Sequence, residues 1–582
     1  MLKTIGAQIK EFKTAAIITP LFMLLEVLME TIIPKLMANV IDDGIYAGDQ
    51  GYIYRTCILM IICAFVSLFG GWMGAKYGAK ASMGLGRNLR KAMFENIQNF
   101  SFANIDKYST AGLVTRMTTD VTNIQNAFMM LLRMAMRAPA SLICAMAMSF
   151  FISPRLASIY LIAVIILGCF LALIVYKAMG YFREAFTKYD DLNASVQENV
   201  SAIRVVKAYD RGNYEKSKFK KASQNIYNML FRAENVVLWN APLMNFTVYS
   251  CILLISWFGA HAVVDGELST GNLTALLAYC MNILMNLMML SMIFVMMSMS
   301  VASANRIAEV LNEESTLKNP ENPDFDIPNG SIRFENVSFR FNDTSEAPIL
   351  DNINLTIASG ETIGIIGATG SSKSSLVNLI SRLYDVNEGA VYVGGKDVRS
   401  YDLDTLRNEV SVVLQQNVLF SGSILDNLRW GDPNATEEEC RKACQMACAD
   451  DFIQGFPNKY NTHIEQGGTN VSGGQKQRLC IARALLKKPK ILILDDSTSA
   501  VDTATDAKIR RAFKEAIPGT TKIIIAQRIS SVMEADRIIV MDNGKISAFD
   551  THEELLKNNA IYRDVYDSQT NGGGDFDEGG AS

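Results

Sequence analysis

A glycine- and serine-rich loop carries the most specific chemistry in this chain. Its sequence, GATGSSKSS, stands between residues 362–366, which have the composition of a strand, and residues 373–382, which have the spacing of a helix. Backbone N–H groups at such a helix start can cradle phosphates, a lysine can neutralise their charge, and a hydroxyl can bind Mg²⁺. The last two roles fall to Lys373 and Ser374. A nucleotide is therefore predicted to bind Gly367, Ala368, Thr369, Gly370, Ser371, Ser372, Lys373, Ser374 and Ser375.

The loop departs from its usual pattern at one position. Glycine normally precedes the lysine, whereas this chain has Ser372. Serine carries a Cβ atom, so a left-handed backbone at this position costs free energy. The departure weakens the prediction that the loop binds nucleotide tightly.

Residues 490–495, KILILD, form an apolar run that ends in an acid. Such a run predicts a buried strand, and a carboxylate at its carboxyl end can hold Mg²⁺ through water. Asp495 is therefore a candidate metal-binding residue. Taken alone, the run favours an ordinary strand followed by a turn.

The segments around these residues predict an α/β domain. After a linker at 319–330 that is rich in Pro, Asn and Asp, β-rich segments such as 331–341 and 353–357 alternate with helical ones. Such alternation is typical of a largely parallel sheet. We expect a nucleotide-binding domain over residues 331–568 and a disordered Gly- and Asp-rich tail over residues 569–582.

The first half of the chain is predicted to cross a membrane. One span needs about 20 apolar residues, and the candidate segments are 15–37, 54–76, 137–152, 156–176, 239–263 and 273–297. The third is short and is expected to begin earlier. We expect a transmembrane domain over residues 15–318, preceded at 1–14 by an interfacial helix rather than a cleaved signal peptide.

Positive charge is distributed unequally between the loops. Residues 39–53 and 261–272 contain no Lys or Arg, whereas 76–116 and 177–232 contain many. The positive-inside rule places these two basic stretches, both termini and the α/β domain in the cytoplasm of a multi-pass cell-membrane protein. The basic stretches have helical spacing, so the spans are expected to continue into the cytosol. They are interrupted at 106–120 and 208–215, which are expected to be either elbows that touch a cytosolic partner or solvated loops.

Composition excludes several classes of protein. The chain has 582 residues, of which 49% are hydrophobic and 20% charged, so it is neither disordered nor fibrous. A net charge of −4 gives no general case for nucleic-acid binding. The 10 cysteines form no short extracellular cluster, which disfavours a disulfide scaffold. Three of them, at helical spacing from Cys440 to Cys448, are expected to pack on one helix face rather than bind a metal.

A further motif identifies a family. Residues 471–486, VSGGQKQRLCIARALL, resemble the signature motif and helix of ATP-binding cassette (ABC) proteins. Together with the phosphate loop, the strand ending at Asp495 and the spans before the cassette, the chain resembles a multidrug-type ABC exporter half-transporter. The resemblance implies that two such chains dimerise, sandwich two ATP molecules with Mg²⁺, and alternate a substrate cavity between the two sides of the membrane. The spans exclude phosphate-loop ATPases that act on DNA, and no nucleic-acid partner is expected.

The resemblance also implies roles for single residues. Phe341 corresponds to the aromatic residue that stacks on adenine, Gln415 to the glutamine that senses γ-phosphate and Mg²⁺, and Glu465 to the acid that contacts the partner's coupling helices. Asp502 belongs to the D-loop at 499–502, and the metal is expected at Ser374, Gln415 and Asp495. The interrupted segments 106–120 and 208–215 fall where the family has its coupling helices.

The signature has a physical logic of its own. It opens a helix, where free N–H groups and the helix dipole favour an anion. The resemblance implies that this anion is the γ-phosphate of the ATP held by the opposite chain. The contacting residues would be Ser472, Gly473, Gly474 and Gln475.

Two catalytic positions do not match the family. The resemblance places a base, normally Glu, at Asp496, and aspartate is one methylene shorter than glutamate. It places the switch histidine at Gln527, and glutamine cannot accept and return a proton near neutral pH. A degenerate site beside an intact signature favours one half of a heterodimer. This chain would then bind ATP in a slow site and complete a competent site on its partner, although an enzyme that simply works less well also fits.

The sequence is compatible with more than one class of substrate. Eight methionines lie within residues 281–299, and such flexible side chains suit adaptable apolar binding as well as ordinary packing. Glu26 and Glu30 lie on one helical face of the first span, and they suit either a cationic amphiphile or a basic neighbour. Three hypotheses follow: export of hydrophobic or amphiphilic compounds, a lipid or lipid-linked flippase, and a non-transporting subunit that regulates a membrane partner.

Overall fold

A computed structural model of the chain describes residues 1–341, 347–497 and 500–570. Ser499 of the expected D-loop and residues 571–582 of the expected tail lie outside these ranges. The chain divides into two compact units. One comprises Met1–Asn99 and Tyr108–Glu313, and the other comprises Phe100–Lys107 together with the chain from Glu314 onward.

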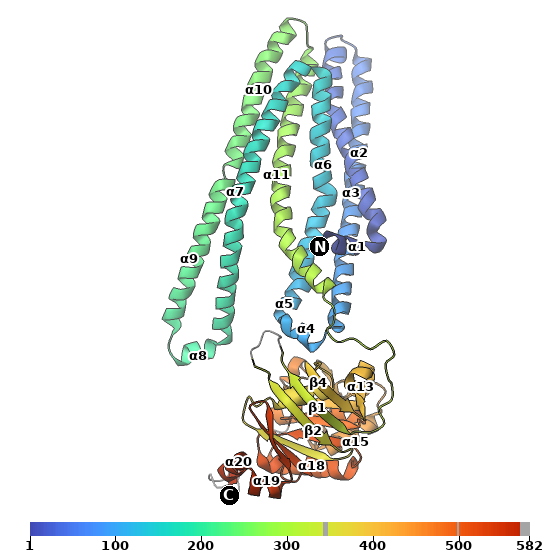
Figure 1. Ribbon diagram of the computed structural model, residues 1–582. Coiled ribbons are helices and arrows are strands. Elements are labelled where there is room, and N and C mark those ends of the chain that lie inside the picture. The colour runs from blue at the N-terminus through green and yellow to red at the C-terminus, as the bar shows by residue number, and fades with distance from the viewer. Residues whose placement is uncertain (342–346, 498–499, 571–582) are drawn as a thin grey trace. The chain divides into compact units, whose positions relative to one another are not determined.

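The first unit is a bundle of long helices (Figure 1). Within the described residues, six helices are long and apolar enough to cross a membrane, which confirms the predicted membrane fold. The third begins well before its predicted start, as expected for a span that looked short. The fifth of these spans, Gly212–Val264, comprises the consecutive helices α9 and α10. The long helices are α2 Lys13–Asn39, α3 Gln50–Gln98, α6 Val121–Ile152, α7 Pro154–Ser201, α9 Gly212–Val237, α10 Asn240–Val264 and α11 Thr270–Asn312.

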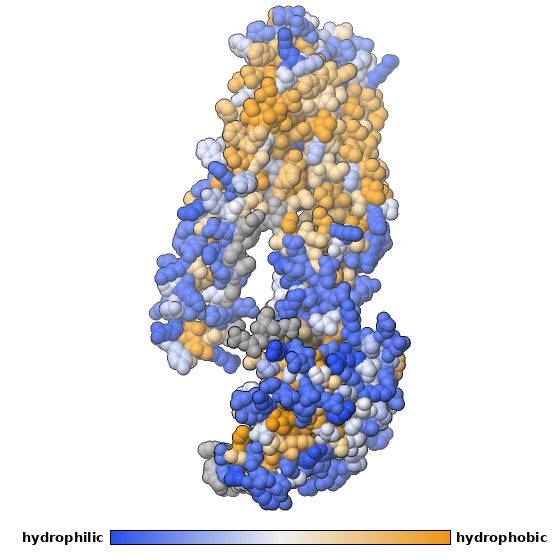
Figure 2. Space-filling view, viewed as in Figure 1, coloured by the Kyte–Doolittle hydropathy of each residue, from blue (hydrophilic) through white to orange (hydrophobic). Residues whose placement is uncertain are grey.

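Several helices extend beyond the apolar part of the bundle. Hydrophobic residues gather over the upper parts of these helices, and hydrophilic residues cover the extensions of α7 and α9 (Figure 2). Short elements turn the chain between the long helices. They are α1 Leu2–Ala7, η1 Lys10–Phe12, η2 Val40–Ile45, α5 Thr110–Thr115, η3 Arg116–Asp120 and α8 Ile203–Ala208.

Small residues let α2 and α3 pack closely. Gly70, Gly74 and Gly78 recur every fourth residue along α3 and so lie on one face of it. A Cβ atom on Gly70 would lie 3.1 Å from the carbonyl oxygen of Phe22, and one on Gly74 would lie 2.2 Å from Cε of Met23. The close contact between α2 and α3 therefore requires glycine at these positions, because a larger side chain would collide with α2.

The acids of the first span have a basic partner. The Arg137 guanidinium on α6 donates from Nη2 to both carboxylate oxygens of Glu30, each at 2.9 Å, and lies 3.4 Å from Glu26. The Glu26 side chain is only 14% exposed. Glu26 and Glu30 were expected either to bind a cationic amphiphile or to pair with a basic neighbour. In the structure they pair with Arg137.

Neutral polar groups continue this contact toward α11. The Ser141 hydroxyl donates to Oδ1 of Asn282 at 2.9 Å, and Nδ2 of Asn286 donates to the Ser141 oxygen at 3.0 Å. Ser141 lies one helical turn beyond Arg137 on α6. Ionic and polar contacts therefore tie α2, α6 and α11 together inside the apolar bundle.

Replacing Arg137 by methionine is expected to destabilise the bundle. Removing one member of a buried ion pair leaves the other charged, which costs about 2–4 kcal/mol at a partly exposed site. Thermal unfolding of the full chain in detergent measures the change. The triple variant Glu26→Gln, Glu30→Gln and Arg137→Met should recover most of the lost stability, and a single variant as stable as wild type would contradict this account.

The second unit is an α/β domain with two principal sheets. The larger has strand order β12-β11-β3-β10-β9-β6, all parallel except β12, and the smaller, antiparallel sheet has the order β2-β1-β4-β5. The mixed α/β architecture is as predicted. The strands are β1 Ile332–Phe339, β2 Leu350–Ile357, β3 Thr362–Gly367, β4 Glu388–Val393, β5 Lys396–Asp397, β6 Val410–Val413, β7 Gly422–Ser423, β8 His463–Ile464, β9 Ile491–Asp495, β10 Thr521–Ile525, β11 Arg537–Asp542 and β12 Lys545–Asp550.

Helices cover this sheet and fill a core with buried aliphatic and aromatic side chains. Cys440 and Cys444 are fully buried in that core, and in the described residues no group of three or more His, Cys, Asp or Glu side chains could hold a metal. The principal helices are α12 Lys373–Ile380, α13 Leu403–Glu409, α14 Ile424–Leu428, α15 Glu437–Met446, α16 Asp450–Gln454, α17 Gly473–Leu486, α18 Thr503–Ala516, α19 His552–Asn558 and α20 Ala560–Thr570.

One helix from the first half of the chain belongs to this second unit. Helix α4, Phe102–Lys107, packs on the α/β domain, where the Tyr384 hydroxyl donates to Oδ2 of Asp106 at 2.7 Å and the ring of Phe102 meets that of Tyr384. Asn104 accepts from the backbone N–H of Thr316 at 3.1 Å. The contact with the domain therefore lies mostly before the elbow expected at residues 106–120.

Candidate nucleotide site

The carboxyl ends of four neighbouring parallel strands bring the predicted site residues together. In the order β3, β10, β9 and β6, Ile525 pairs with both Ile365 and Asp495, and Val413 pairs with Leu494. The phosphate loop follows β3, Gln527 follows β10, Asp496 follows β9 and Gln415 follows β6. Ligands in α/β sheets bind beyond the carboxyl ends of the strands. Residues more than 100 positions apart in sequence thus form one site.

The phosphate loop has a strained residue next to its lysine. Ser372 adopts φ 71° and ψ 23°, in the left-handed region, directly before helix α12. The Lys373 ammonium donates to the carbonyl oxygens of Gly367 at 2.8 Å and Ala368 at 2.9 Å. Burial lowers the pKa of Lys373, and the nearby carboxylates of Asp495 and Asp496 oppose that shift. The loop therefore encloses a cation at the start of a helix, as phosphate binding requires.

Two adjacent acids face this lysine. Asp495 is 5% exposed, and burial raises the pKa of its carboxyl although Ser374 hydrogen bonds to it. Burial also raises the pKa of Asp496, which accepts a hydrogen bond from Nε2 of Gln527 at 2.8 Å and another from Gln415. The oxygen donors of Ser374, Gln415 and Asp495 suit Mg²⁺, which keeps few protein ligands and completes its shell with water and phosphate oxygens.

The aromatic residue expected to stack on adenine lies on a cluster of rings. Phe341 is 46% exposed, and its ring meets Phe339 and Tyr384 edge-on, at centroid distances of 5.0 and 5.1 Å. The exposed part of its ring is thus available to a base.

The signature residues form a well-capped helix start. Ser472 accepts from the N–H of Gln475 at 3.3 Å, and its own N–H donates to Oε1 of Gln475 at 2.9 Å, a reciprocal capping box on α17. A Cβ atom on Gly474 would lie 2.7 Å from the Ala500 carbonyl oxygen, so only glycine fits there. Asp502 accepts from the N–H of Thr505 at 2.9 Å and caps α18.

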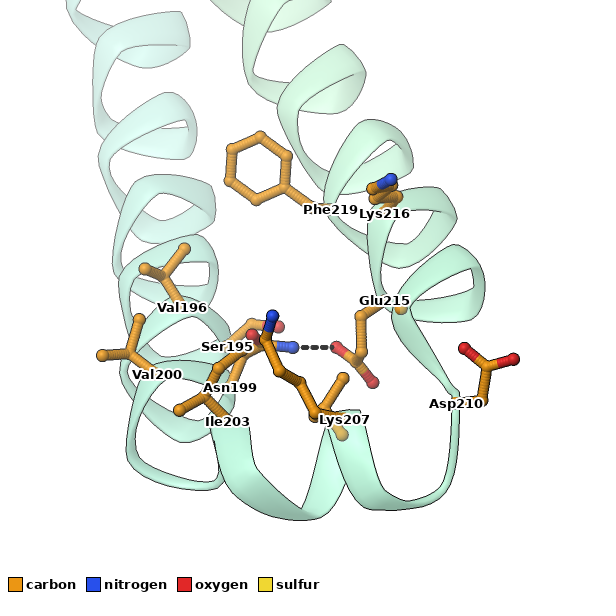
Figure 3. Close-up of a pocket in the computed structure, with 12 residues that line it drawn as sticks. Ser195, Val196, Asn199, Val200, Ile203, Lys207, Asp210, Glu215, Lys216 and Phe219 are labelled. Atoms are coloured by element: carbon orange, nitrogen blue, oxygen red, sulfur yellow. Dashed lines mark hydrogen bonds between the residues drawn. The ribbon is translucent and has the colours of Figure 1, made fainter.

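Two other predicted or possible sites share no residue with this cluster. Glu465 is exposed, and its carboxylate accepts from the Thr469 hydroxyl at 2.8 Å. In the membrane unit, a cavity of about 690 Å³ lies between α7, α8 and α9, with Asn199 donating to Glu215 at 2.9 Å across it (Figure 3). This cavity contains none of the predicted nucleotide-binding residues.

Both halves of the chain match known families. A family model described as the ABC transporter transmembrane region matches residues 16–313, and one described as ABC transporter matches residues 350–499. The chain is 36% identical over 561 residues to "Uncharacterized ABC transporter ATP-binding protein YfiB" of Bacillus subtilis (strain 168), with 96% of this chain and 97% of that protein covered. The chain belongs to the ABC transporter family.

Further relatives agree with this membership of the ABC transporters. "Uncharacterized ABC transporter ATP-binding protein MT1311" of Mycobacterium tuberculosis (strain CDC 1551 / Oshkosh) is 35% identical over 576 residues, covering 98% of each chain. A solved structure, "Structure of a bacterial Atm1-family ABC exporter with ATP bound", shares the fold with a TM-score of 0.83 at 22% identity, over 96% of this chain and 99% of that one. This ABC transporter thus joins a transmembrane domain and an ABC ATPase domain in one chain, and it has the fold of that exporter structure.

Sequence reasoning missed Tyr384 of this ABC transporter. Its ring contacts Phe341, and its hydroxyl donates to Asp106 of α4. Burial and the Asp106 carboxylate raise the pKa of this phenol. The only available signal was a tyrosine beside an apolar helix, whose hydroxyl needs a partner when buried.

Replacing Ser372 by glycine is expected to tighten ATP binding. A non-glycine residue in the left-handed region costs about 1–2 kcal/mol, so relief of this strain in the phosphate-bound loop should lower the dissociation constant for ATP by at most about five- to thirtyfold. Equilibrium binding of a fluorescent ATP analogue to the full chain measures the change. The comparison variant is Ser371→Gly, because Ser371 has no positive φ; it also loses the hydroxyl that accepts from Lys373 at 3.3 Å, so it should bring no gain in affinity. An equal gain in both variants would contradict the role of strain.

Proposed function

We propose that this ABC exporter chain is one half of a heterodimer, in which its own ATP site hydrolyses slowly and its signature completes a competent site on the partner. The observation that carries the proposal is the hydrogen bond from Gln527 to Asp496, because these residues occupy the switch and base positions. Neither side chain has the chemistry that the family uses there.

Asp496 is poorly suited to activate a water molecule. A general base must reach the proton that it removes within about 2.6–3.2 Å, and aspartate has the shorter side chain. Its carboxylate also accepts from the amides of Gln527 and Gln415, which occupy lone pairs that a base would need. Gln527 cannot shuttle a proton as a histidine can. We therefore expect bound ATP to persist in this site.

The groups for binding ATP are nevertheless present. We assign Phe341 to the adenine ring and the loop from Gly367 to Ser375 to the phosphates, with Lys373 as the counter-charge. Ser374, Gln415 and Asp495 would hold Mg²⁺, which would neutralise phosphate charge when bound. These assignments rest on the convergence of the strand ends and on the oxygen donors gathered there.

The signature supports a role in the partner's site. Its capping box leaves the first N–H groups of α17 at an exposed helix start, where an anion is favoured. We propose that Ser472–Gln475 and Asp502 contact ATP held by the partner. Glu465 and the segments 106–120 and 208–215 would take part in contacts between the cytoplasmic loops and the cassettes, with the cassettes and both termini in the cytoplasm.

The heterodimer can be tested by comparing a substitution in the signature with one at the base position of the same chain. The tagged full-length chain would be purified from its native membrane, where an unlike ABC half-transporter should accompany it at about equal amount. Ser472→Ala is expected to lower ATP turnover of this complex at least about tenfold, because it damages the competent site, whereas Asp496→Ala should change turnover less than about twofold.

A matched control separates the signature from simple loss of a helix cap. Ser423 caps α14 with the same reciprocal capping box, so Ser423→Ala removes an equivalent cap outside the signature. It should leave turnover near that of wild type. Brisk turnover by the purified chain without a second protein, abolished by Asp496→Ala, would contradict the proposal.

We propose hydrophobic or amphiphilic compounds as the substrate. Five methionines of α11 with exposed side chains recur every three or four residues and so share one face, where flexible thioether chains can adapt to varied apolar ligands. They are 40–64% exposed in the single chain, whereas neighbouring residues of α11 are buried against other helices. The face consists of Met281, Met285, Met288, Met292 and Met296.

Polar substitutions on this face should weaken drug responses. The double variant Met285→Gln and Met292→Gln is expected to reduce drug stimulation of ATP turnover in proteoliposomes about threefold or more, because apolar contact is lost. Met136, which is 43% exposed on α6, provides the control Met136→Gln. Stimulation by lipids alone would favour a flippase, and no stimulation by either class would favour a regulatory subunit.

A further inference from the structure

The C-terminal helix of the chain is hydrogen-bonded to the loop that carries Gln527. The Gln569 side chain, near the end of α20, donates from Nε2 to the backbone carbonyl of Gln527 at 2.9 Å. Its Oε1 accepts from the backbone N–H of Ile529 at 2.8 Å. One amide group thus bridges two backbone polar groups on either side of a single intervening residue.

The same loop is held on its other side by the nucleotide site. The Gln527 side chain reaches Asp496, donating to Oδ2 at 2.8 Å. The backbone N–H of Ala526 donates to the carbonyl of Ile365 in β3 at 3.3 Å. A short series of contacts therefore runs from Gln569 through Gln527 to the acid at the base position.

Helix α20, which carries Gln569, is itself held in place by burial and hydrogen bonds. Tyr562 is fully buried, and its hydroxyl lies 2.7 Å from Nδ1 of His552 in the preceding helix α19. The N–H of Tyr562 donates to Oδ1 of Asn559 at 2.8 Å. Ile529 is itself only 3% exposed, so the loop residue that donates to Gln569 is packed against the domain core.

We propose that Gln569 is a positioning residue for the loop of Gln527. By fixing the backbone at Gln527 and Ile529, it keeps the Gln527 amide on Asp496, and the C-terminal helix thereby sets how fast ATP is turned over in this site. The inference rests on the proposed function only for its turnover readout, since the backbone contact itself can be measured directly.

Physical reasoning separates the expected effects on binding and on turnover. ATP affinity depends on the phosphate loop and the aromatic residue, which Gln569 does not touch, so the dissociation constant should stay within about twofold. Loss of one backbone hydrogen bond raises local opening about two- to tenfold. Release of the Gln527 amide from Asp496 frees a lone pair that a base needs, so it should raise the rate of the chemical step without a matching change in affinity.

The test compares three variants of the full-length chain. Gln569→Leu removes both hydrogen bonds, and Gln569→Glu keeps the acceptor for Ile529 but places a carboxylate oxygen against the Gln527 carbonyl. Ser568→Ala is the control, because the Ser568 hydroxyl donates only within its own helix, to the carbonyl of Val565 at 2.9 Å. The readouts are amide hydrogen exchange at Ile529, the dissociation constant for MgATP, and single-turnover release of labelled phosphate.

In Gln569→Leu, we expect exchange at Ile529 to be about fivefold faster and the single-turnover rate to rise about tenfold, with unchanged MgATP affinity. Gln569→Glu should keep exchange near wild type and still raise the rate, and Ser568→Ala should change none of the three. Wild-type exchange in Gln569→Leu, or faster exchange with a wild-type rate in both Gln569 variants, would overturn the inference. Faster exchange throughout the domain, with weakened affinity, would also overturn it, because it would indicate a general loss of stability. Brisk turnover by the wild-type chain alone would contradict only the slow site proposed above, and the comparison among variants would still decide the role of Gln569.

Discussion

Parallel pairing of β3, β10, β9 and β6 determines where every polar group of the nucleotide site lies. The pairs are apolar and buried, as in Ile493 against Ile523, so the sheet register is set by the core rather than by the site. A shift of one residue would turn Asp495 to the opposite face of the sheet. The loop of Lys373, the amide of Gln527 and the acid Asp496 meet because four strands end at one edge.

In this arrangement, phosphate binding and water activation depend on different residues of the same site. In the proposed site, the counter-charge for phosphates would come from Lys373, whose ammonium donates to two carbonyl oxygens of the loop. Water activation needs a free carboxylate, and Asp496 instead accepts from two amides. A site of this kind can retain affinity for ATP while its rate of hydrolysis changes, because the two properties depend on different contacts.

Local patterns were sufficient to predict the membrane helices, the α/β domain and the residues that gather at the strand ends. A strand, a glycine-rich loop and a helix form one continuous segment around Lys373, so their relation is visible in the sequence. The partner of Glu30 was not, because Arg137 lies 107 residues away on another span and nothing in the spacing links the two. The same limit applies to Gln569, whose contact is with backbone atoms of a loop, and backbone atoms leave no trace in a residue pattern. The elbow expected at 106–120 overlaps helix α4, which meets the domain, only at Asp106 and Lys107.

The position of α4 in the second unit has a consequence for biosynthesis. Asp106 and its partner Tyr384 are 278 residues apart, so the ribosome adds all the intervening spans before the contact can form. At about 5–20 residues per second, this interval is roughly 15–55 s. During that time Phe102 and Asn104 lack the surface against which they pack in the finished protein. The second unit can therefore be completed only after the last span has been made, which links maturation of the ABC ATPase domain to synthesis of the whole membrane bundle.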